Sequence, residues 1–175
     1  MAKVRYRSRM ADIFTKAKRS EVMSRIRSRG NKDTEGAMVA VLRGAGITGW
    51  RRQLELRIKN VEGRNKACLL NLKSRPFRVR PDFVWRRERV ALFVDGCFWH
   101  VCPWHGTKPA SNKAFWREKL AKNRARDRLV TRTLRKEGWR VVRVWEHTLP
   151  RAARDVRELE KLVARITKEL NHGIH

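Results

Sequence analysis

The chain has 175 residues and a formal net charge of +27, because it carries 44 Lys and Arg residues against 17 Asp and Glu residues. Hydrophobic residues make up 41% of it, which is enough to build a folded core and excludes a wholly disordered chain. The charge favours a polyanionic partner, with nucleic acid first and an anionic membrane surface second. No apolar stretch of about 20 residues is present, so we expect no membrane-spanning helix.

The cysteine content and the start of the chain indicate the cellular compartment in which we expect the protein. Three cysteines are an odd number, which gives no disulfide framework and favours a reducing environment. The basic start is not followed by an apolar run, so we expect no secretory signal. The composition therefore predicts a cytoplasmic nucleic-acid binder without membrane attachment.

We interpret residues 1–11 as a basic N-terminal arm and residues 12–175 as a single domain. Apolar residues recur loosely at helical spacing from Asp12 to Arg29, which favours a first helix. A second helix is clearer, because Asp33 or Thr34 can cap it and Gly44–Gly46 can end it.

Three segments in the middle of the chain have the character of strands. Leu54–Ile58 is a candidate strand, and Phe77–Trp85 alternates between apolar and polar residues. Val90–Val94 is a continuous apolar run, which is typical of a strand buried on both faces. The four residues Arg86–Arg89 between the last two segments suit a hairpin turn.

The last third of the chain predicts a helix, a strand and a second helix. The long helix runs from about Ser111 to Lys136, the strand is Trp139–Trp145, and the amphipathic helix is Ala152–Leu170 with Val156 on its inner face. This order of elements predicts an α/β fold in which helices flank a mixed sheet.

The densest group of metal-ligating side chains follows the apolar strand. Cys97, Cys102 and His105 offer three ligands from one loop, and His147 just beyond the last strand is the natural fourth. Thiolate and imidazole together favour zinc, so we expect a zinc site that joins this loop to a strand end. The alternative is that these are unpaired small polar residues in a loop. His100 could coordinate zinc in place of His105, or it could serve as a base.

Two acidic residues lie beside the predicted strands. Asp82 follows a proline, and Asp95 ends the apolar run. An acid after proline at a strand pair resembles the metal-binding half of the PD-(D/E)xK nuclease core, where a carboxylate binds magnesium that polarises a phosphate and activates water. Turns also use Pro-Asp, however, and Cys97 stands where that motif has its lysine.

A third acid and several aromatic residues add to this picture. Asp127 lies on the apolar face of the long helix, so it needs a buried partner, which is either an arginine or a catalytic histidine. Asn123, one turn earlier, raises the same question. Aromatic residues lie among the basic ones and can stack on bases or cover the core: Phe98, Trp99, Trp104 and Trp116.

These motifs together resemble the very short patch repair (Vsr) endonucleases. The matching strings are Arg-Pro-Asp-Phe-Val at residues 80–84, Phe-Val-Asp-Gly-Cys-Phe-Trp-His at residues 93–100, Phe-Trp at residues 115–116, Asn-x3-Asp-Arg at residues 123–128, and Gly-Trp-Arg-Val at residues 138–141, which is followed by Trp-Glu-His at 145–147. The resemblance extends from near Met10 to about Leu149. It implies a restriction-endonuclease-like fold with a structural zinc, and a magnesium-dependent nick on the 5′ side of the thymine in a T·G mismatch that arises from deaminated 5-methylcytosine.

The resemblance also implies roles for individual residues. Asp82 would be the magnesium-binding carboxylate, with the backbone carbonyl of Val94 as a second ligand. His100 would be the catalytic histidine that activates water, Asp127 the acid that supports it, and Glu35 an acid on an early helix that assists at the active site. The zinc ligands carry over as Cys97, Cys102, His105 and His147, and the aromatics that wedge into DNA beside the mismatch as Phe98, Trp99 and Trp116.

Two departures from the family pattern affect these expectations. Asp95 stands where some members carry histidine, so no second catalytic histidine is expected. The segment from about Arg57 to Arg78 is longer and more basic than in the best-known members, so the DNA sequence that those members recognise does not carry over to this chain.

We therefore expect a monomeric, nucleoid-associated enzyme of bacterial type that acts on double-stranded DNA with a T·G mismatch, with mismatch-repair proteins as candidate partners. Two other functions stay open. One is a non-enzymatic DNA-binding module held together by zinc, and the other is a restriction-type nuclease of undamaged DNA. The non-enzymatic DNA-binding module would leave Asp82, His100 and the inward Asp127 without a function.

Overall fold

The computed structural model describes residues 32–58, 77–107, 109, 112–149 and 156–171. The expected basic arm, the expected helix from Asp12 to Arg29, and Cys68 lie outside these residues. So does most of the basic segment from Arg57 to Arg78. No helix in the described ranges is long and apolar enough to cross a membrane.

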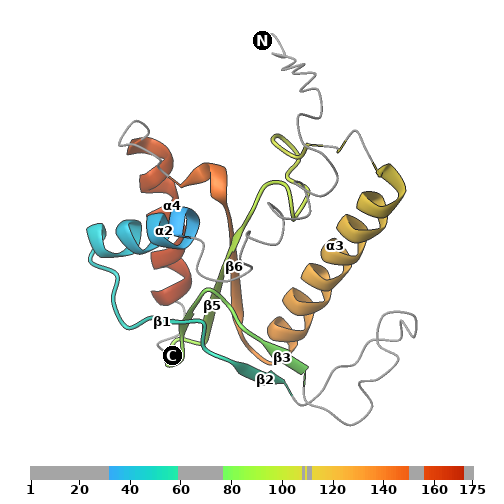
Figure 1. Ribbon diagram of the computed structural model, residues 1–175. Coiled ribbons are helices and arrows are strands. Elements are labelled where there is room, and N and C mark those ends of the chain that lie inside the picture. Colours follow the sequence, from blue (N-terminus) through green and yellow to red (C-terminus); the bar gives the residue numbers. More distant parts are fainter. Residues whose placement is uncertain (1–31, 59–76, 108, 110–111, 150–155, 172–175) are drawn as a thin grey trace. The chain divides into compact units, whose positions relative to one another are not determined.

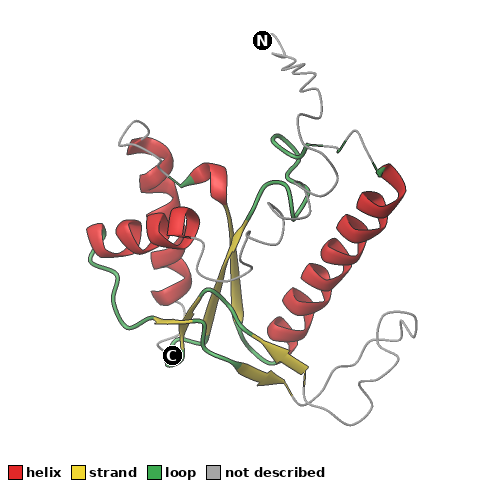
Figure 2. Cartoon of the chain, in the orientation of Figure 1, coloured by secondary structure: helices red, strands yellow, loops and turns green. Residues whose placement is uncertain are grey.

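The main sheet is mixed, as the sequence predicts. Its four strands lie in the order β1 (Arg51–Arg52), β4 (Phe83–Trp85), β5 (Val90–Asp95) and β6 (Arg140–Trp145). The strands are drawn in yellow in Figure 2. The pairs β1–β4 and β4–β5 are antiparallel, and the turn between β4 and β5 is the hairpin that was expected. β5 and β6 are parallel, and the connection between them carries the long helix.

The alternating segment from Phe77 to Trp85 is two strands rather than one. β3 (Phe77–Val79) pairs with β2 (Leu56–Ile58) in a separate two-stranded sheet, whereas β4 belongs to the main sheet. The division falls at Pro81, which has no N–H to give to a ladder and has a fixed φ. The physical consequence is that Asp82 comes directly before β4, where the chain changes sheets.

Helices cover both faces of the main sheet (Figure 1). On one face α2 (Lys32–Gly44) and α4 (Val156–Asn171) pack against side chains of β4, β5 and β6, with Met38, Leu92 and Ile166 fully buried. On the other face Leu134 of α3 (Lys113–Lys136) packs with Val84 and the small sheet. Val156 does not face inward: it begins α4 and is 59% exposed.

This topology brings chemically active residues to one edge of the sheet. Because β5 and β6 are parallel, both strands end at the same edge, where Asp95 lies opposite Trp145. The loop of residues 96–107 leaves β5 there, and the short 3-10 helix η1 (Glu146–Thr148) leaves β6 there. Since side chains alternate along a strand, Asp95 and Arg143 both point to the face that α3 covers.

Candidate active site and metal centre

Asp82 is a mostly buried carboxylate held by the neighbouring strand. The backbone N–H of Val94 donates a 2.7 Å hydrogen bond to its Oδ2 atom. Burial raises the pKa of Asp82 to about 6, and the nearby charges of Glu35 and Asp95 act in the same direction, while the Val94 hydrogen bond and His100 oppose them. A carboxylate in such an environment gains strongly from a cation, which is the setting of a divalent metal ligand.

Glu35 lies on α2 with only 5% of its surface exposed. Nη2 of Arg52 is 2.5 Å from its Oε2, and Nε2 of Gln53 donates to its Oε1 at 3.0 Å. The backbone N–H of Gln53 in turn donates to the carbonyl oxygen of Asp82 at 3.2 Å, from a left-handed conformation with φ of 54°. The end of β1 thus ties Glu35 to the segment that carries Asp82, and no motif in the sequence marks Arg52 and Gln53 for this position.

His100 and Asp127 form a short contact, with Nδ1 and Oδ2 2.6 Å apart. Burial lowers the pKa of His100, but the hydrogen bond with Asp127 and the charge of Asp95 outweigh it, so the pKa is raised. Burial raises the pKa of Asp127, but His100 and Arg143 together lower it below its usual value. The inward acid of α3 therefore stays ionised and supports the imidazole.

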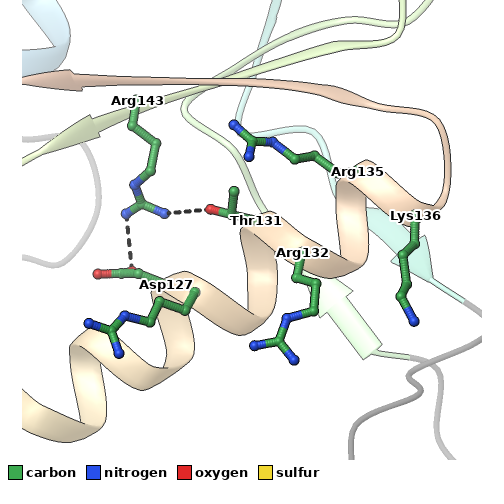
Figure 3. A pocket seen from close by; sticks show the side chains of 7 residues that line it. Asp127, Thr131, Arg132, Arg135, Lys136 and Arg143 are labelled. Carbon is green, nitrogen blue, oxygen red and sulfur yellow. Dashed lines mark hydrogen bonds and ion pairs between the residues drawn. The ribbon is translucent and has the colours of Figure 1, made fainter.

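Arg143 joins this pair to a second carboxylate. Its Nε and Nη2 atoms lie 2.6 Å and 2.5 Å from the two oxygens of Asp95. Its Nη2 atom is also 3.1 Å from Oδ1 of Asp127, an ion pair that Figure 3 shows. Asp127 thus has both of the partners that the sequence left open, an arginine and a histidine. Arg143 was not among the predicted site residues, although an arginine between two valines inside a strand was a usable signal.

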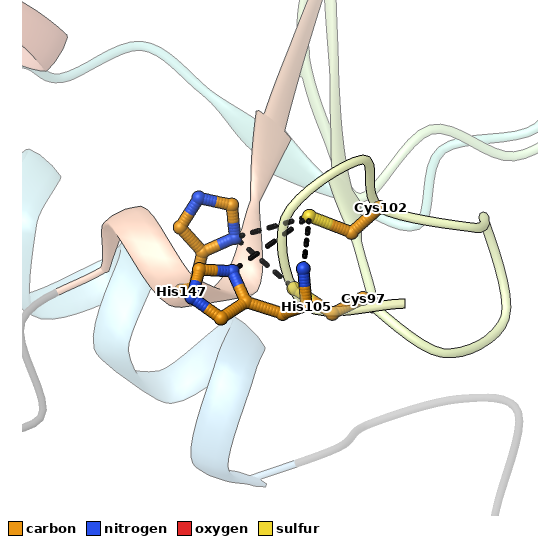
Figure 4. A group of neighbouring side chains, drawn as sticks. All are labelled: Cys97, Cys102, His105 and His147. Atoms are coloured by element: carbon orange, nitrogen blue, oxygen red, sulfur yellow. Dashed lines mark hydrogen bonds between the residues drawn. The ribbon is translucent and has the colours of Figure 1, made fainter. Parts of the chain in front are cut away.

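The loop after β5 and the end of β6 bring two cysteines and two histidines together (Figure 4). The ligand atoms of all four residues lie within 4.8 Å of one another. Sγ of Cys97 is 3.1 Å from Nδ1 of His147, and Sγ of Cys102 is 3.6 Å from the same atom. His100 is not in this group, so His105 occupies the place that the sequence left open between the two.

The donor set of this cluster fits a zinc ion. Two thiols and two imidazoles are the ligands of a closed tetrahedral site. Burial raises the pKa of Cys97 to about 12, so its thiolate needs a cation, and burial together with His105 lowers the pKa of His147, which favours the neutral ligand form. Gly106 keeps the loop compact: a Cβ there would lie 2.5 Å from the carbonyl oxygen of Cys102.

The aromatic residues of the loop meet those at the start of α3. Ring centroids are 5.1 Å apart for Phe98 and Trp99, 5.2 Å for Phe98 and Trp116, and 6.0 Å for Trp99 and Trp116. The Asn123 side chain donates to the carbonyl oxygen of Trp99 at 3.2 Å, which answers the question raised by its inward position. Phe115, which is 51% exposed, extends this aromatic cluster; it belongs to the strings that carry the resemblance but was not among the aromatics expected to enter DNA.

Comparison with known proteins gives evidence, independent of the geometry, about the family to which this chain is similar. The family described as "DNA mismatch endonuclease Vsr" matches residues 68–107, a range that contains Asp82, His100 and three of the four cluster ligands. The DNA mismatch endonuclease Vsr of Escherichia coli (strain K12) is 36% identical over 141 residues, which cover 80% of this chain and 76% of that protein.

Relatives with a different description are also similar. The type II nicking enzyme V.NmeAIP of Neisseria meningitidis serogroup A is 34% identical over 159 residues, covering 90% of this chain and 97% of that protein. The type II nicking enzyme V.NaeI of Lentzea aerocolonigenes is 46% identical over 98 residues, which span only 54% of its length.

Proposed function

The chain belongs to the Vsr family of DNA mismatch endonucleases, and we propose that it is a magnesium-dependent endonuclease that nicks double-stranded DNA on the 5′ side of the thymine in a T·G mismatch. One observation carries this proposal: a mostly buried carboxylate, Asp82, and a histidine–carboxylate pair, His100 and Asp127, gather at one edge of a mixed sheet. The same arrangement supports a restriction-endonuclease-like, PD-(D/E)xK-related fold.

Asp82 and the backbone carbonyl of Val94 would hold the magnesium ion, with Glu35 adding negative charge behind Asp82. When bound, the ion polarises the scissile phosphate and stabilises the charge that develops on its oxygens. The hydrogen bonds from Arg52 and Gln53 fix Glu35, so the protein holds its acidic groups in place before substrate arrives.

His100 would act as the general base. Because its Nδ1 contacts the ionised Asp127, the neutral imidazole keeps its proton on Nδ1 and leaves Nε2 free to accept one from a water molecule. Asp127 stabilises the imidazolium that results. The water attacks the phosphorus, and the bond to the 3′ oxygen of the preceding nucleotide breaks, which leaves a nick in one strand.

Zinc would be structural. Cys97, Cys102, His105 and His147 supply four ligands and leave no position for water, so the ion would hold the loop of His100 against the end of β6. Phe98, Trp99 and Trp116 lie on the same loop and on α3, and would enter the duplex at the mismatch, where a base step costs less to unstack. We further propose that the enzyme acts as a monomer near the nucleoid, with mismatch-repair proteins as candidate partners.

A strand-specific nicking assay tests the proposal. A duplex with one T·G pair and its matched control are incubated with magnesium or with EDTA, for the wild type and for Asp82→Ala. We expect a nick only in the T strand, only with magnesium, and none with the variant. Failure to nick in any sequence context, together with tight DNA binding, would instead indicate a zinc-containing DNA-binding module.

A second candidate function is favoured by the relatives described as type II nicking enzymes. In that case the chain would nick undamaged DNA at a specific sequence. Equal nicking of matched and mismatched duplexes would support this function and would remove the role in mismatch repair.

A further inference from the structure

A cavity of about 640 Å³ opens between α3 and β6, beside the candidate active site (Figure 3). Asp127 and Arg143 line one end of it, and successive turns of α3 line the rest with Arg128, Thr131, Arg132, Arg135 and Lys136. We call this cavity the basic groove. Its lining has five basic residues and one acid, and that acid already contacts His100 and Arg143.

The three arginines that α3 contributes to the basic groove have no acidic partner in the part of the chain that the structure describes, whereas Arg143 of β6 pairs with Asp95 and Asp127. Arg128, Arg132 and Arg135 are exposed, form no ion pair there, and recur at helical spacing so that they lie on one side of α3. Uncompensated guanidinium groups in a row repel one another, and each can bind a phosphate through two parallel hydrogen bonds. Thr131 adds a hydroxyl between them.

The dimensions of the basic groove suit the backbone of one DNA strand. From Asp127 to Arg135 the helix rises by about 12 Å at about 1.5 Å per residue. A duplex carries one phosphate per strand for about every 3.4 Å along its axis, so this length corresponds to roughly three or four successive phosphates. A strand in this position would pass directly from the His100–Asp127 pair along α3.

We propose that the basic groove binds three or four successive phosphates of one DNA strand on one side of the cut, and so sets the register of the duplex on the enzyme. This rests on the proposed function only in that DNA is the ligand. Phosphate contacts of this kind carry no sequence information, but they fix which phosphodiester bond reaches the active site.

Binding measurements without magnesium test the basic groove independently of nicking. The triple variant Arg128→Gln, Arg132→Gln, Arg135→Gln is compared with Arg86→Gln, Arg87→Gln, Arg157→Gln, which removes three exposed arginines elsewhere. The affinity for a matched duplex is measured across salt concentrations in EDTA. We expect the groove variant to lose about 2.7 from the slope of log K against log salt, at about 0.9 per phosphate contact, and the control to lose less than half of that.

Neutral methylphosphonate linkages then locate the contacts. Placed one at a time outward from the cut, they should weaken wild-type binding at three or four adjacent positions on one side only, and should not further weaken the groove variant there. Equal losses in the two triple variants, or no such run of positions, would overturn the proposal. A protein that binds as expected but nicks no duplex would instead contradict the proposed function and leave the basic groove standing.

A second inference follows from the ion pairs of Arg143 alone. Its guanidinium group binds both oxygens of Asp95, contacts Oδ1 of Asp127, and lies over the Phe93 ring with its carbon 5.1 Å from the ring centroid. Oδ2 of Asp127 is therefore directed to His100, and Asp95 is also near, at 3.7 Å from Nδ1 of His100. Without the arginine, two carboxylates beside one imidazole would repel each other.

We infer that Arg143 is a positioning residue, which holds the Asp127 carboxylate in the rotation that orients His100. This too rests on the proposed function. Arg143→Gln should lower kcat by about 100-fold, as expected when a catalytic group is displaced by about 1 Å, with KM changed less than twofold. Arg143→Lys should recover part of the loss, and the double variant Asp95→Asn, Arg143→Gln should be more active than Arg143→Gln because it also removes a repelling charge.

A measurement without catalysis separates this inference from the proposed function. The proton on Nδ1 of His100 should give a hydrogen-bonded resonance in the NMR spectrum of the wild type, which is lost in Arg143→Gln and retained in the control Arg157→Gln. Retention of this resonance in Arg143→Gln, or a rise in KM with kcat unchanged, would overturn the inference and would indicate a direct phosphate contact.

Discussion

Oδ2 of Asp127 lies 2.6 Å from Nδ1 of His100, and this one contact decides which imidazole nitrogen can accept a proton. The two residues come from different elements, since Asp127 lies on α3 and His100 in the loop after β5. An ionised acid on Nδ1 holds the proton there, so the opposite nitrogen is the basic one. The ability of His100 to accept a proton thus depends on how α3 packs beside the loop of residues 96–107.

Replacing Asp127 with Asn should therefore affect the rate rather than binding. The amide can donate to Nδ1 and favour the wrong tautomer, so kcat should fall by about 10²- to 10⁴-fold while DNA affinity is retained. Single-turnover nicking measures this. Glu118→Gln is the matched control, because Glu118 is an exposed acid on the same helix that pairs only locally with Lys122. A loss below threefold in Asp127→Asn would argue against the histidine as the base.

The same contact predicts a change in the pH profile. A general base works when deprotonated, and the pKa of His100 is raised above 6.5, because Asp127 and Asp95 outweigh the effect of burial. The nicking rate should therefore fall as the pH drops through this raised value. In Asp127→Asn the fall should move to lower pH, and a shift in the other direction would contradict the assignment.

Asp82 should destabilise the metal-free fold at neutral pH. Burial raises its pKa from 3.8 to about 6, so the folded state binds the proton more tightly than the unfolded chain does. The stabilisation of the folded state by this tighter proton binding is complete below pH 3.8 and is lost as the pH rises through 6. At about 1.36 kcal/mol per pKa unit, the loss in the free energy of unfolding reaches about 3 kcal/mol.

Asp82→Asn should accordingly abolish magnesium-dependent nicking and yet raise the free energy of unfolding at pH 8 in EDTA. Urea denaturation at pH 8 and at pH 4 measures both limits, and the difference from the wild type should shrink at the lower pH. A variant that is less stable than the wild type at pH 8 would show that the Val94 hydrogen bond, rather than desolvation, dominates at this position.

One zinc ion per chain should be bound by the Cys/His cluster. Cys102→Ser should weaken metal binding by more than the 10- to 100-fold that is typical when a residue hydrogen-bonded to a metal ligand is lost, and should lower the melting temperature. His147→Cys should retain the metal, since thiolate is also a zinc ligand. Elemental analysis after dialysis against a chelator measures this. Cys68→Ser is the control, and metal loss in that variant would place a ligand outside the cluster.

Two glycine substitutions should have opposite effects on stability. Gly36→Ala adds a Cβ with no atom within 4 Å in a helix, so it should stabilise the fold by about 0.5–1 kcal/mol. Gly106→Ala places a Cβ 2.5 Å from the carbonyl oxygen of Cys102, so the loop of residues 96–107 must shift. Both the stability of the fold and its affinity for zinc should therefore fall. Thermal unfolding with and without chelator distinguishes the two. Equal melting temperatures would mean that the loop adapts freely.

The aromatic cluster should matter for mismatched DNA more than for matched DNA. Trp116→Ala removes a ring that meets both Phe98 and Trp99, so nicking at a T·G pair should fall by about tenfold or more, at about 1–3 kcal/mol per stacking contact. Binding to a matched duplex should change little. Val156→Ala is the control, because Val156 is a 59% exposed apolar residue at the start of α4, which packs on the opposite face of the sheet from α3. Equal losses on the two duplexes would indicate a purely structural cluster.

Much of the fold was readable from local patterns. The apolar run of β5 and the helical spacing of α3 each depend on neighbours in sequence, and the structure has both elements close to the expected bounds. The spacing of Cys97, Cys102 and His105 was equally informative, because one loop of nine residues limits where the ligands can lie. Pro81 could have signalled the break between β3 and β4, but the alternation of apolar residues continues across it.

The remaining features depend on contacts between residues far apart in the chain. Strand β1 has only two residues, both exposed arginines, and exists because Arg51 and Arg52 pair with β4. Asp95 and Arg143 are 48 positions apart, and no periodicity links them. The same is true of Gln53 and Asp82, which meet only after β1 has joined the sheet.

The parallel pairing of β5 and β6 also bears on how the protein folds. Its strands are separated by a connection that holds all of α3, and non-local parallel pairing forms slowly because loop-closure entropy is lost first. A slip of one residue in this pairing would turn Arg143 to the opposite face, away from Asp95. We therefore expect the edge that carries the candidate active site to form late in folding, and a chain with a misregistered β6 to lack nicking activity toward DNA.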